Sequence, residues 1–196
     1  MRSVLCILLL ASLTLPVFAQ EHGGWLIEAG NDSGLLRVVP NDNRTPAGHR
    51  SGDTLEVDLE LVMSDFRPET PDGPGLTVLA LAEVGRAPSV PAPLIRVETG
   101  TIVRARIHNT AGDSTLNVFG FQTRPAREAD SLIVPPGAVG EIEFEVGEPG
   151  TYLYRVRLGG RYRGRNDTER DFLSGAFIID PKGGSTPDRV FVMNIW

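Results

Sequence analysis

The feature that most constrains the fold is a two-residue alternation of apolar and polar side chains. In T-L-E-V-D-L-E-L-V-M, residues 54–63, the apolar residues fall on one face of an extended chain and the acidic residues on the other. Short runs rich in β-branched and aromatic residues follow at close intervals up to residue 180, separated by turns such as V-P-P-G and G-E-P-G. No window has an apolar stripe of helical period. The sequence therefore predicts an all-β fold, a Greek-key β-sandwich or barrel.

The first 19 residues have the layout of a secretory signal peptide. A basic Met1-Arg2 precedes a short apolar run, and Val17-Phe18-Ala19 supplies small residues at the positions that a signal peptidase reads. The run is too short to span a bilayer, so we expect no membrane anchor after cleavage and a secreted or periplasmic protein. The only cysteine, Cys6, lies in this segment. A chain starting at Gln20 has no thiol for a disulfide, a metal site or a nucleophile.

Charge and composition divide the rest of the chain. A formal net charge of −6 argues against nucleic acid as a partner. Residues 20–50 are rich in Gly, Asn, Pro and Arg and are predicted to be an arm that lies across the domain. Residues 51–182 form the predicted β-sandwich domain. Residues 183–196 are predicted to be a linker and a terminal strand, which is either the last of this domain or the first of another.

Five segments in order resemble the first cupredoxin (plastocyanin-like) domain of multicopper oxidases. P-A-P-L-I-R-V-E-T-G-T-I-V-R-A-R-I-H-N resembles the entry into that domain, and S-L-I-V-P-P-G its characteristic turn. T-L-N-V-F-G-F resembles the strand where the family has His-Trp-His-Gly, and G-T-Y-L-Y-R-V-R the strand where it has Tyr-His-Ser-His. L-S-G-A-F-I-I-D-P resembles the closing strand. The resemblance implies a copper-binding oxidoreductase family and further cupredoxin domains as partners, in cis or as subunits.

The same resemblance marks four degenerate copper-ligand positions. Asn117, Phe119, Arg155 and Arg157 stand where the family has four histidines that hold copper. Phenylalanine has no lone pair, asparagine is a poor copper ligand, and arginine does not deprotonate to coordinate a metal. Copper is therefore implied by family resemblance only, no cofactor is expected in this chain, and no catalytic residue is predicted.

The arginines around residues 155–165 allow three interpretations. Arg155 and Arg157 leave the same face of a strand, and Arg161, Arg163 and Arg165 follow in the next loop. They could form an anion-binding pocket, because guanidinium groups bind carboxylates with two hydrogen bonds. They could equally be solvated side chains that pair with nearby acids, or fill the vacated copper cavity and pair with carboxylates of a partner domain.

The three histidines and two of the methionines are candidate metal ligands by residue type. If cleavage follows Ala19, the free amine of Gln20, two backbone amide nitrogens and the imidazole of His22 could form a square-planar site for copper(II) or nickel(II). A disordered tail is the competing interpretation. His49 is predicted to lie in an exposed loop, and His108 at a strand end. Met63 and Met193 alternate with aliphatic residues and are predicted to be core.

These observations favour a structural function. The chain is predicted to be an exported cupredoxin-like domain that packs against further domains. Two alternatives stay open: a stand-alone module that binds an anionic ligand through the arginines, and a piece of a true copper oxidase whose metal sites lie beyond Trp196.

Overall fold

The structure is a computed structural model that describes residues 27–29, 34–110, 112–122, 131–159, 173–184 and 189–192. The predicted signal peptide lies outside the described residues, as do His22, Met193 and the loop with Arg161, Arg163 and Arg165. Among the described residues, no helix is long and apolar enough to cross a membrane.

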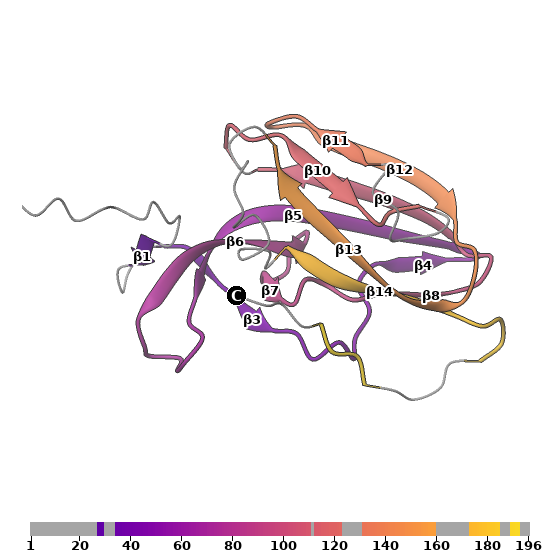
Figure 1. Cartoon of the computed structure of the whole chain (residues 1–196), viewed down its shortest axis with the longest axis horizontal. Coiled ribbons are helices and arrows are strands. Elements are labelled where there is room, and N and C mark those ends of the chain that lie inside the picture. Colours follow the sequence, from indigo (N-terminus) through magenta and orange to yellow (C-terminus); the bar gives the residue numbers. More distant parts are fainter. Residues whose placement is uncertain are drawn as a thin grey trace, which may run out of the picture.

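Two β-sheets make up the described part of the chain, and strands of the two sheets face each other across the core (Figure 1). The all-β sandwich predicted from the sequence is confirmed. The nine-stranded sheet has the path β12-β9-β5-β6-β7-β3, with β1 beside β6 and with β2 and β4 beside β5. Its strands are β1 (Ile27–Ala29), β2 (Leu36–Arg37), β3 (Val39–Pro40), β4 (His49–Ser51), β5 (Thr54–Phe66), β6 (Gly75–Glu83), β7 (Ser89–Val90), β9 (Ile102–Asn109) and β12 (Val139–Glu145).

The five-stranded sheet has the order β11-β10-β13-β14-β8. Its strands are β8 (Ile95–Glu98), β10 (Leu116–Phe119), β11 (Leu132–Val134), β13 (Gly150–Leu158) and β14 (Ser174–Asp180). From β8 onward the chain passes repeatedly between the sheets, which gives cross-sheet connections of the Greek-key kind.

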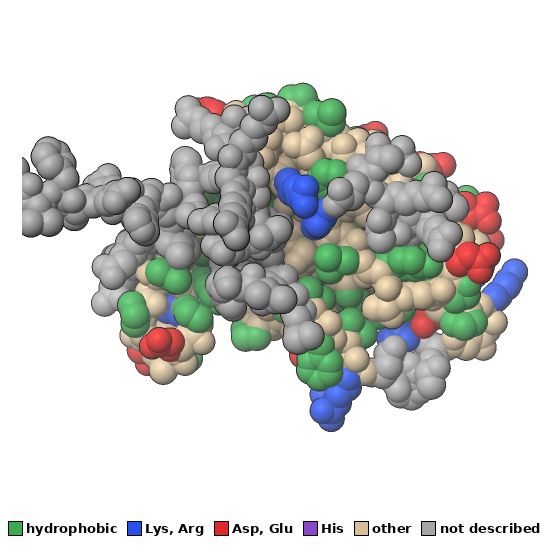
Figure 2. Space-filling model, viewed as in Figure 1, with side chains coloured by type: hydrophobic (Ala, Val, Ile, Leu, Met, Phe, Trp, Pro, Cys, Tyr) green, Lys and Arg blue, Asp and Glu red, His purple; other side chains and the backbone are tan. Residues whose placement is uncertain are grey.

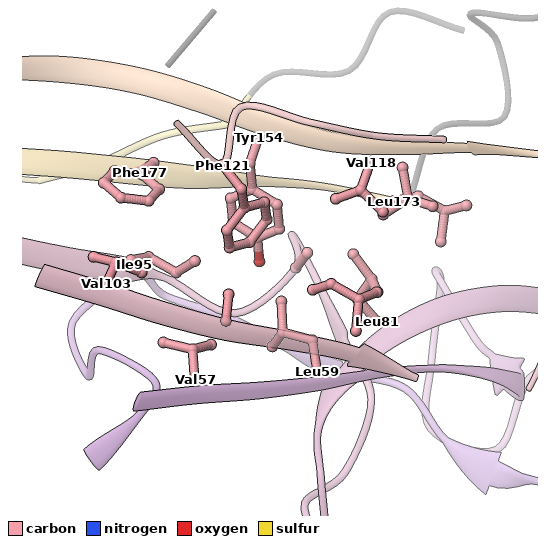
Figure 3. Packing of buried hydrophobic residues seen from close by; sticks show 14 of the residues in the cluster. Val57, Leu59, Leu81, Ile95, Val103, Val118, Phe121, Tyr154, Leu173 and Phe177 are labelled. Carbon is pink, nitrogen blue, oxygen red and sulfur yellow. The ribbon is translucent and has the colours of Figure 1, made fainter. Parts of the chain in front are cut away.

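The main core lies between the inner faces of the two sheets (Figure 3). Leu59 and Val57 enter it from β5, and Tyr154 and Phe177 enter it from the opposite sheet. Phe121 packs edge-on against both rings, with centroids 5.1 Å from Tyr154 and 6.2 Å from Phe177. Edge-to-face pairs of this kind contribute about 0.5–1.5 kcal/mol beyond the area that they bury.

Strand β5 follows the predicted alternation over most of its length but not at its end. Leu55, Val57, Leu59 and Leu61 are buried as predicted, whereas Met63 is 44% exposed. The prediction of Met63 as core is wrong because the covered face changes there. Ser64, on the opposite face, is buried and pairs with Val78, which belongs to a second small cluster with Val38.

The described parts of the N-terminal arm form edge strands and turns around the first sheet. β2 pairs with the end of β5, β3 with β7, and β4 with the start of β5. At the other end of the chain, residues 189–192 are described outside any strand, and the rest of the predicted terminal strand lies outside the described residues. Val190 and Val192 pack against a patch on the five-stranded sheet, formed by Leu94, Ala176 and Ile178.

Candidate functional site

The four degenerate positions meet on the outer face of the five-stranded sheet. β10 and β13 pair antiparallel, and their register sets Asn117 opposite Arg157 and Phe119 opposite Arg155. Val118 and Val156, which lie between these positions, and Tyr154, which precedes Arg155, point into the core. Because side chains alternate along a strand, the four positions share the face turned away from the core.

Both guanidinium groups of this face contact one aromatic ring. The Cζ atom of Arg155 lies 5.4 Å from the centroid of the Phe119 ring, and the Cζ atom of Arg157 lies 5.5 Å from the same centroid. These distances are within the range of cation–π attraction. We call Phe119, Arg155 and Arg157 the Arg–Phe–Arg cluster. All three side chains are partly buried.

The residues at these positions do not fit copper. Two cations and an aromatic ring occupy the place that the resemblance assigns to three of four imidazoles, and neither residue type donates an electron pair to a metal. Among the described residues there is also no group of three or more His, Cys, Asp or Glu side chains that could hold a metal ion. We therefore derive no copper chemistry from this face.

Exposed apolar side chains border the cluster. Ile133 of β11 lies opposite Asn117 and is 61% exposed, and Leu153 of β13 precedes Arg155 on the same face and is 42% exposed. In the space-filling view, Lys and Arg side chains stand among hydrophobic and uncharged surface where Figure 1 has β10 and β13 (Figure 2). The sequence analysis missed Ile133 and Leu153. The two-residue alternation places Leu153 on the same face as Arg155 and could have indicated it from the sequence. Its exposure, however, depends on what covers the sheet.

The C-terminal segment lies on another part of the same face. Val190 and Val192 pack onto Ala176 and Ile178 of β14, and the side-chain amide of Asn43 donates a hydrogen bond to the Val190 carbonyl at 3.2 Å. Phe191, between the two valines, is 79% exposed. The C-terminal segment therefore lies beside Leu153, whose register partner is Ala176.

Close packing behind the cluster fixes the two strands that carry it. Gly120, just after β10, has a φ of +91°, and a Cβ atom there would lie 2.7 Å from the Leu153 carbonyl oxygen and from the Tyr154 Cα. Only glycine allows both this conformation and this approach. The Tyr154 hydroxyl donates a hydrogen bond to the Pro93 carbonyl at 2.5 Å, and burial raises the pKa of this phenol far above its ordinary value.

A second pair of arginines lies on the outer face of the other sheet. Arg104 of β9 contacts Glu143 at 2.8 Å and Glu56 at 3.2 Å. Arg106 contacts Asp58, and its hydrogen bonds hold the pKa of that carboxyl below its ordinary value. These arginines take their carboxylates from the strands on either side.

The remaining histidines lie apart from the cluster. His49 is exposed, on β4. His108 lies near the end of β9, on the nine-stranded sheet. Its Nε2 atom is 3.6 Å from the Oδ1 atom of Asp58. Glu141, Glu143 and Glu145 line the exposed face of the edge strand β12, as their alternation predicts.

Fold and face together define a class: a cupredoxin-like β-sandwich in which Asn, Phe and two Arg occupy the positions that the resemblance assigns to copper ligands. Comparisons with known proteins find similarity to a nitrite reductase fusion protein and to copper proteins. The "Probable nitrite reductase-hydroxylamine oxidoreductase fusion protein" of Kuenenia stuttgartiensis is 31% identical over 119 residues, which cover 56% of this chain and 14% of that protein. No family model matches the chain.

Similar solved structures are copper proteins of greater length. The copper nitrite reductase from Nitrosomonas europaea is 23% identical, with a TM-score of 0.49 over 66% of this chain and 42% of that chain. The blue copper oxidase from the same organism is 21% identical, with a TM-score of 0.48 over 67% and 40% of the two chains. The multicopper oxidase from Campylobacter jejuni is 16% identical, with a TM-score of 0.47 over 81% and 34%. This chain thus spans less than half the length of each protein.

Proposed function

We propose that this chain is an exported structural domain that packs against a further cupredoxin domain, in the same polypeptide or in another subunit. The contact surface is the outer face of the five-stranded sheet. The signal-peptide layout of residues 1–19 supports export to the periplasm or the exterior. The small share of its curated relative that the chain spans supports further domains.

The observation that carries the proposal is the composition of the outer face. The four positions that could have held copper carry Asn, Phe and two Arg, and Ile133 and Leu153 beside them expose apolar surface. Interface cores are enriched in aromatic residues and arginine, and apolar patches mark sites of protein contact. The face therefore has the composition of a docking surface, while its residues cannot perform copper chemistry.

The alternative is a stand-alone module that binds a free anion through the arginines. It is favoured by the convergence of Arg155 and Arg157 on one ring, with Arg161, Arg163 and Arg165 close in sequence. A small anion would cover the guanidinium groups but leave Ile133 and Leu153 open to water. The two functions thus differ in what happens to these apolar side chains.

Hydroxyl-radical footprinting of the protein, in the form in which its host exports it, tests the proposal. Val84 and Val139 are matched internal controls, because they are 45% and 47% exposed and lie away from the outer face. We expect Leu153 and Ile133 to be oxidised several-fold more slowly than these two valines, after correction for intrinsic reactivity. Oxidation of all four at rates that follow their exposure would refute docking on this face.

A further inference from the structure

The C-terminal segment, residues 189–192, covers an apolar part of the outer face of the five-stranded sheet. Ala176 and Ile178 alternate with core residues along β14, so their side chains point to this outer face. Val190 and Val192 of the segment pack on them. We call residues 189–192 the strap. The floor beneath the strap consists of three residues that are at most 3% exposed: Leu94, Ala176 and Ile178.

The strap is held by side-chain contacts and not by strand pairing. Its four residues are described outside any strand. The two valines contact the floor, and the Val190 carbonyl accepts a hydrogen bond of 3.2 Å from the Nδ2 atom of Asn43. Phe191, between the valines, is 79% exposed. Segments with few buried apolar contacts open locally at a small cost in free energy, so a competing segment could replace the strap.

Asn43 is buried and fixed in place by the N-terminal arm. It is 5% exposed, has a φ of 54°, and its backbone N–H donates to the Oδ1 atom of Asn41 at 2.9 Å. The Nδ2 atom of Asn41 in turn donates to the Ala92 carbonyl at 3.0 Å. The Oδ1 atom of Asn43, however, is buried and has no hydrogen-bond partner among the described residues. A buried acceptor without a donor is destabilising.

An extended segment can use both halves of such a carboxamide. In an extended chain the N–H and C=O groups of one residue point to the same side, so one asparagine can donate to the carbonyl and accept from the amide. The strap engages only the donor of Asn43 in the described contacts. Proteins that bind extended segments take affinity from backbone hydrogen bonds and specificity from alternate side chains. The unused acceptor therefore points to a ligand that fits Asn43 better than the strap does.

We propose that residues 189–192 are a displaceable strap, and that an extended segment of the docked domain replaces them on the floor. The inference rests on the proposed function, because it takes the replacing segment from the docked domain. The position of the floor supports it: Ala176 is the register partner of Leu153, so the floor continues the proposed contact surface. The replacing segment has two apolar side chains two residues apart, as the strap has, and offers both backbone groups of one residue to Asn43.

The test removes the strap from the protein purified from its own host and follows the floor by hydroxyl-radical footprinting. Val190→Asp with Val192→Asp places carboxylates against apolar side chains. Burying an unpaired carboxylate there is unfavourable, so the strap leaves the floor. We expect oxidation of Leu94 and Ile178 to stay within twofold of the wild-type rate, because the segment of the docked domain covers them.

Two further variants complete the design. Val84→Asp with Val139→Asp is the matched control, because these valines are 45% and 47% exposed and lie away from the outer face, and it should leave the floor at the wild-type rate. Asn43→Asp keeps the size of the side chain but replaces the amide donor by a carboxylate oxygen, which repels the carbonyl of the bound segment. We expect it to raise oxidation of Leu94 and Ile178 several-fold.

The outcomes separate the inference from the function on which it rests. If Leu153 and Ile133 are protected in the wild type but loss of the strap raises oxidation of the floor several-fold, docking stands and the inference is overturned. An unchanged floor in Asn43→Asp also overturns it. If Leu153 and Ile133 are not protected in the wild type, the proposed function fails and the inference with it. Leu59 of the main core reports folding, and Val190→Asp alone replaces the double variant if Leu59 loses protection.

Discussion

Tyr154→Phe removes a single buried hydrogen bond from behind the outer face of the five-stranded sheet. The Tyr154 hydroxyl donates to the Pro93 carbonyl at 2.5 Å, and the side chain is fully buried. Phenylalanine keeps the ring and its edge contact with Phe121 but leaves the carbonyl without this donor. A buried polar group left unsatisfied costs about 1–3 kcal/mol, so we expect the free energy of unfolding to fall by about 2 kcal/mol. For a chain of this size that corresponds to a melting temperature lower by about 4–8 °C.

Tyr152→Phe is the matched control for this change. Tyr152 lies two residues earlier on the same face of β13, and its hydroxyl donates to the Glu148 carbonyl at 3.0 Å in an exposed position. Water replaces that bond, so the loss should stay within about 0.5 kcal/mol. Urea unfolding followed by tryptophan fluorescence measures both variants. Equal losses in the two would refute the assignment of the Tyr154 hydroxyl as a buried donor.

The same residue predicts a difference at alkaline pH. Burial raises the pKa of Tyr154 above its ordinary value of 10.0, so the unfolded chain releases this proton first as the pH rises. Stability from the neutral phenol is complete below about pH 10 and is lost above it, by about 1.4 kcal/mol per pH unit. We expect wild-type stability to fall more steeply than that of Tyr154→Phe between pH 10 and 11.5. Parallel curves would contradict the burial of this phenol.

Three further changes test the packing around Tyr154, the ion pairs on the outer face of the nine-stranded sheet, and the register of β10 and β13. Gly175→Ala would place a Cβ atom 2.5 Å from the Tyr154 ring and should cost about 1–3 kcal/mol in unfolding free energy, whereas Gly184→Ala, with open space around it, should be nearly neutral. Asp58→Asn should make the free energy of unfolding fall less steeply in acid. Arg106 lowers the pKa of Asp58, and the stability that this gives is lost as the pH falls below about 3.8. An unchanged pH dependence in urea unfolding at acid pH would contradict this. Asn117→His, Phe119→His, Arg155→His and Arg157→His together should create copper(II) binding measurable by equilibrium dialysis, because the register sets the two pairs side by side. No gain over wild type would refute that register.

The strands were predictable from the sequence because their signal is local. Period-two alternation in 54–63 places Leu55 and Leu61 in the core, and the spacing of Arg155 and Arg157 puts both on one face. The exposure of Met63 was not predictable. Near the end of β5 the N-terminal arm covers the face opposite to Met63, and the local sequence pattern does not report this. Local pattern likewise does not report that Val190 and Val192 pack onto a face of the other sheet.

The site was predictable only in part because its contacts depend on register. Sequence motifs single out Asn117, Phe119, Arg155 and Arg157, but the contact of both guanidinium groups with Phe119 depends on how β10 and β13 align. The same applies to Arg104 and Arg106. Their spacing equals that of Arg155 and Arg157, and only pairing with β5 and β12 shows that their carboxylates come from adjacent strands.

Native mass spectrometry of the protein purified from its own host tests the central claim most directly. The same sample under denaturing conditions gives the mass of the polypeptide. The account predicts a native particle larger than a single chain of residues 20–196, through further covalent domains or through bound subunits. A monomer with the mass of residues 20–196 alone would contradict the claim that this domain works by docking against another.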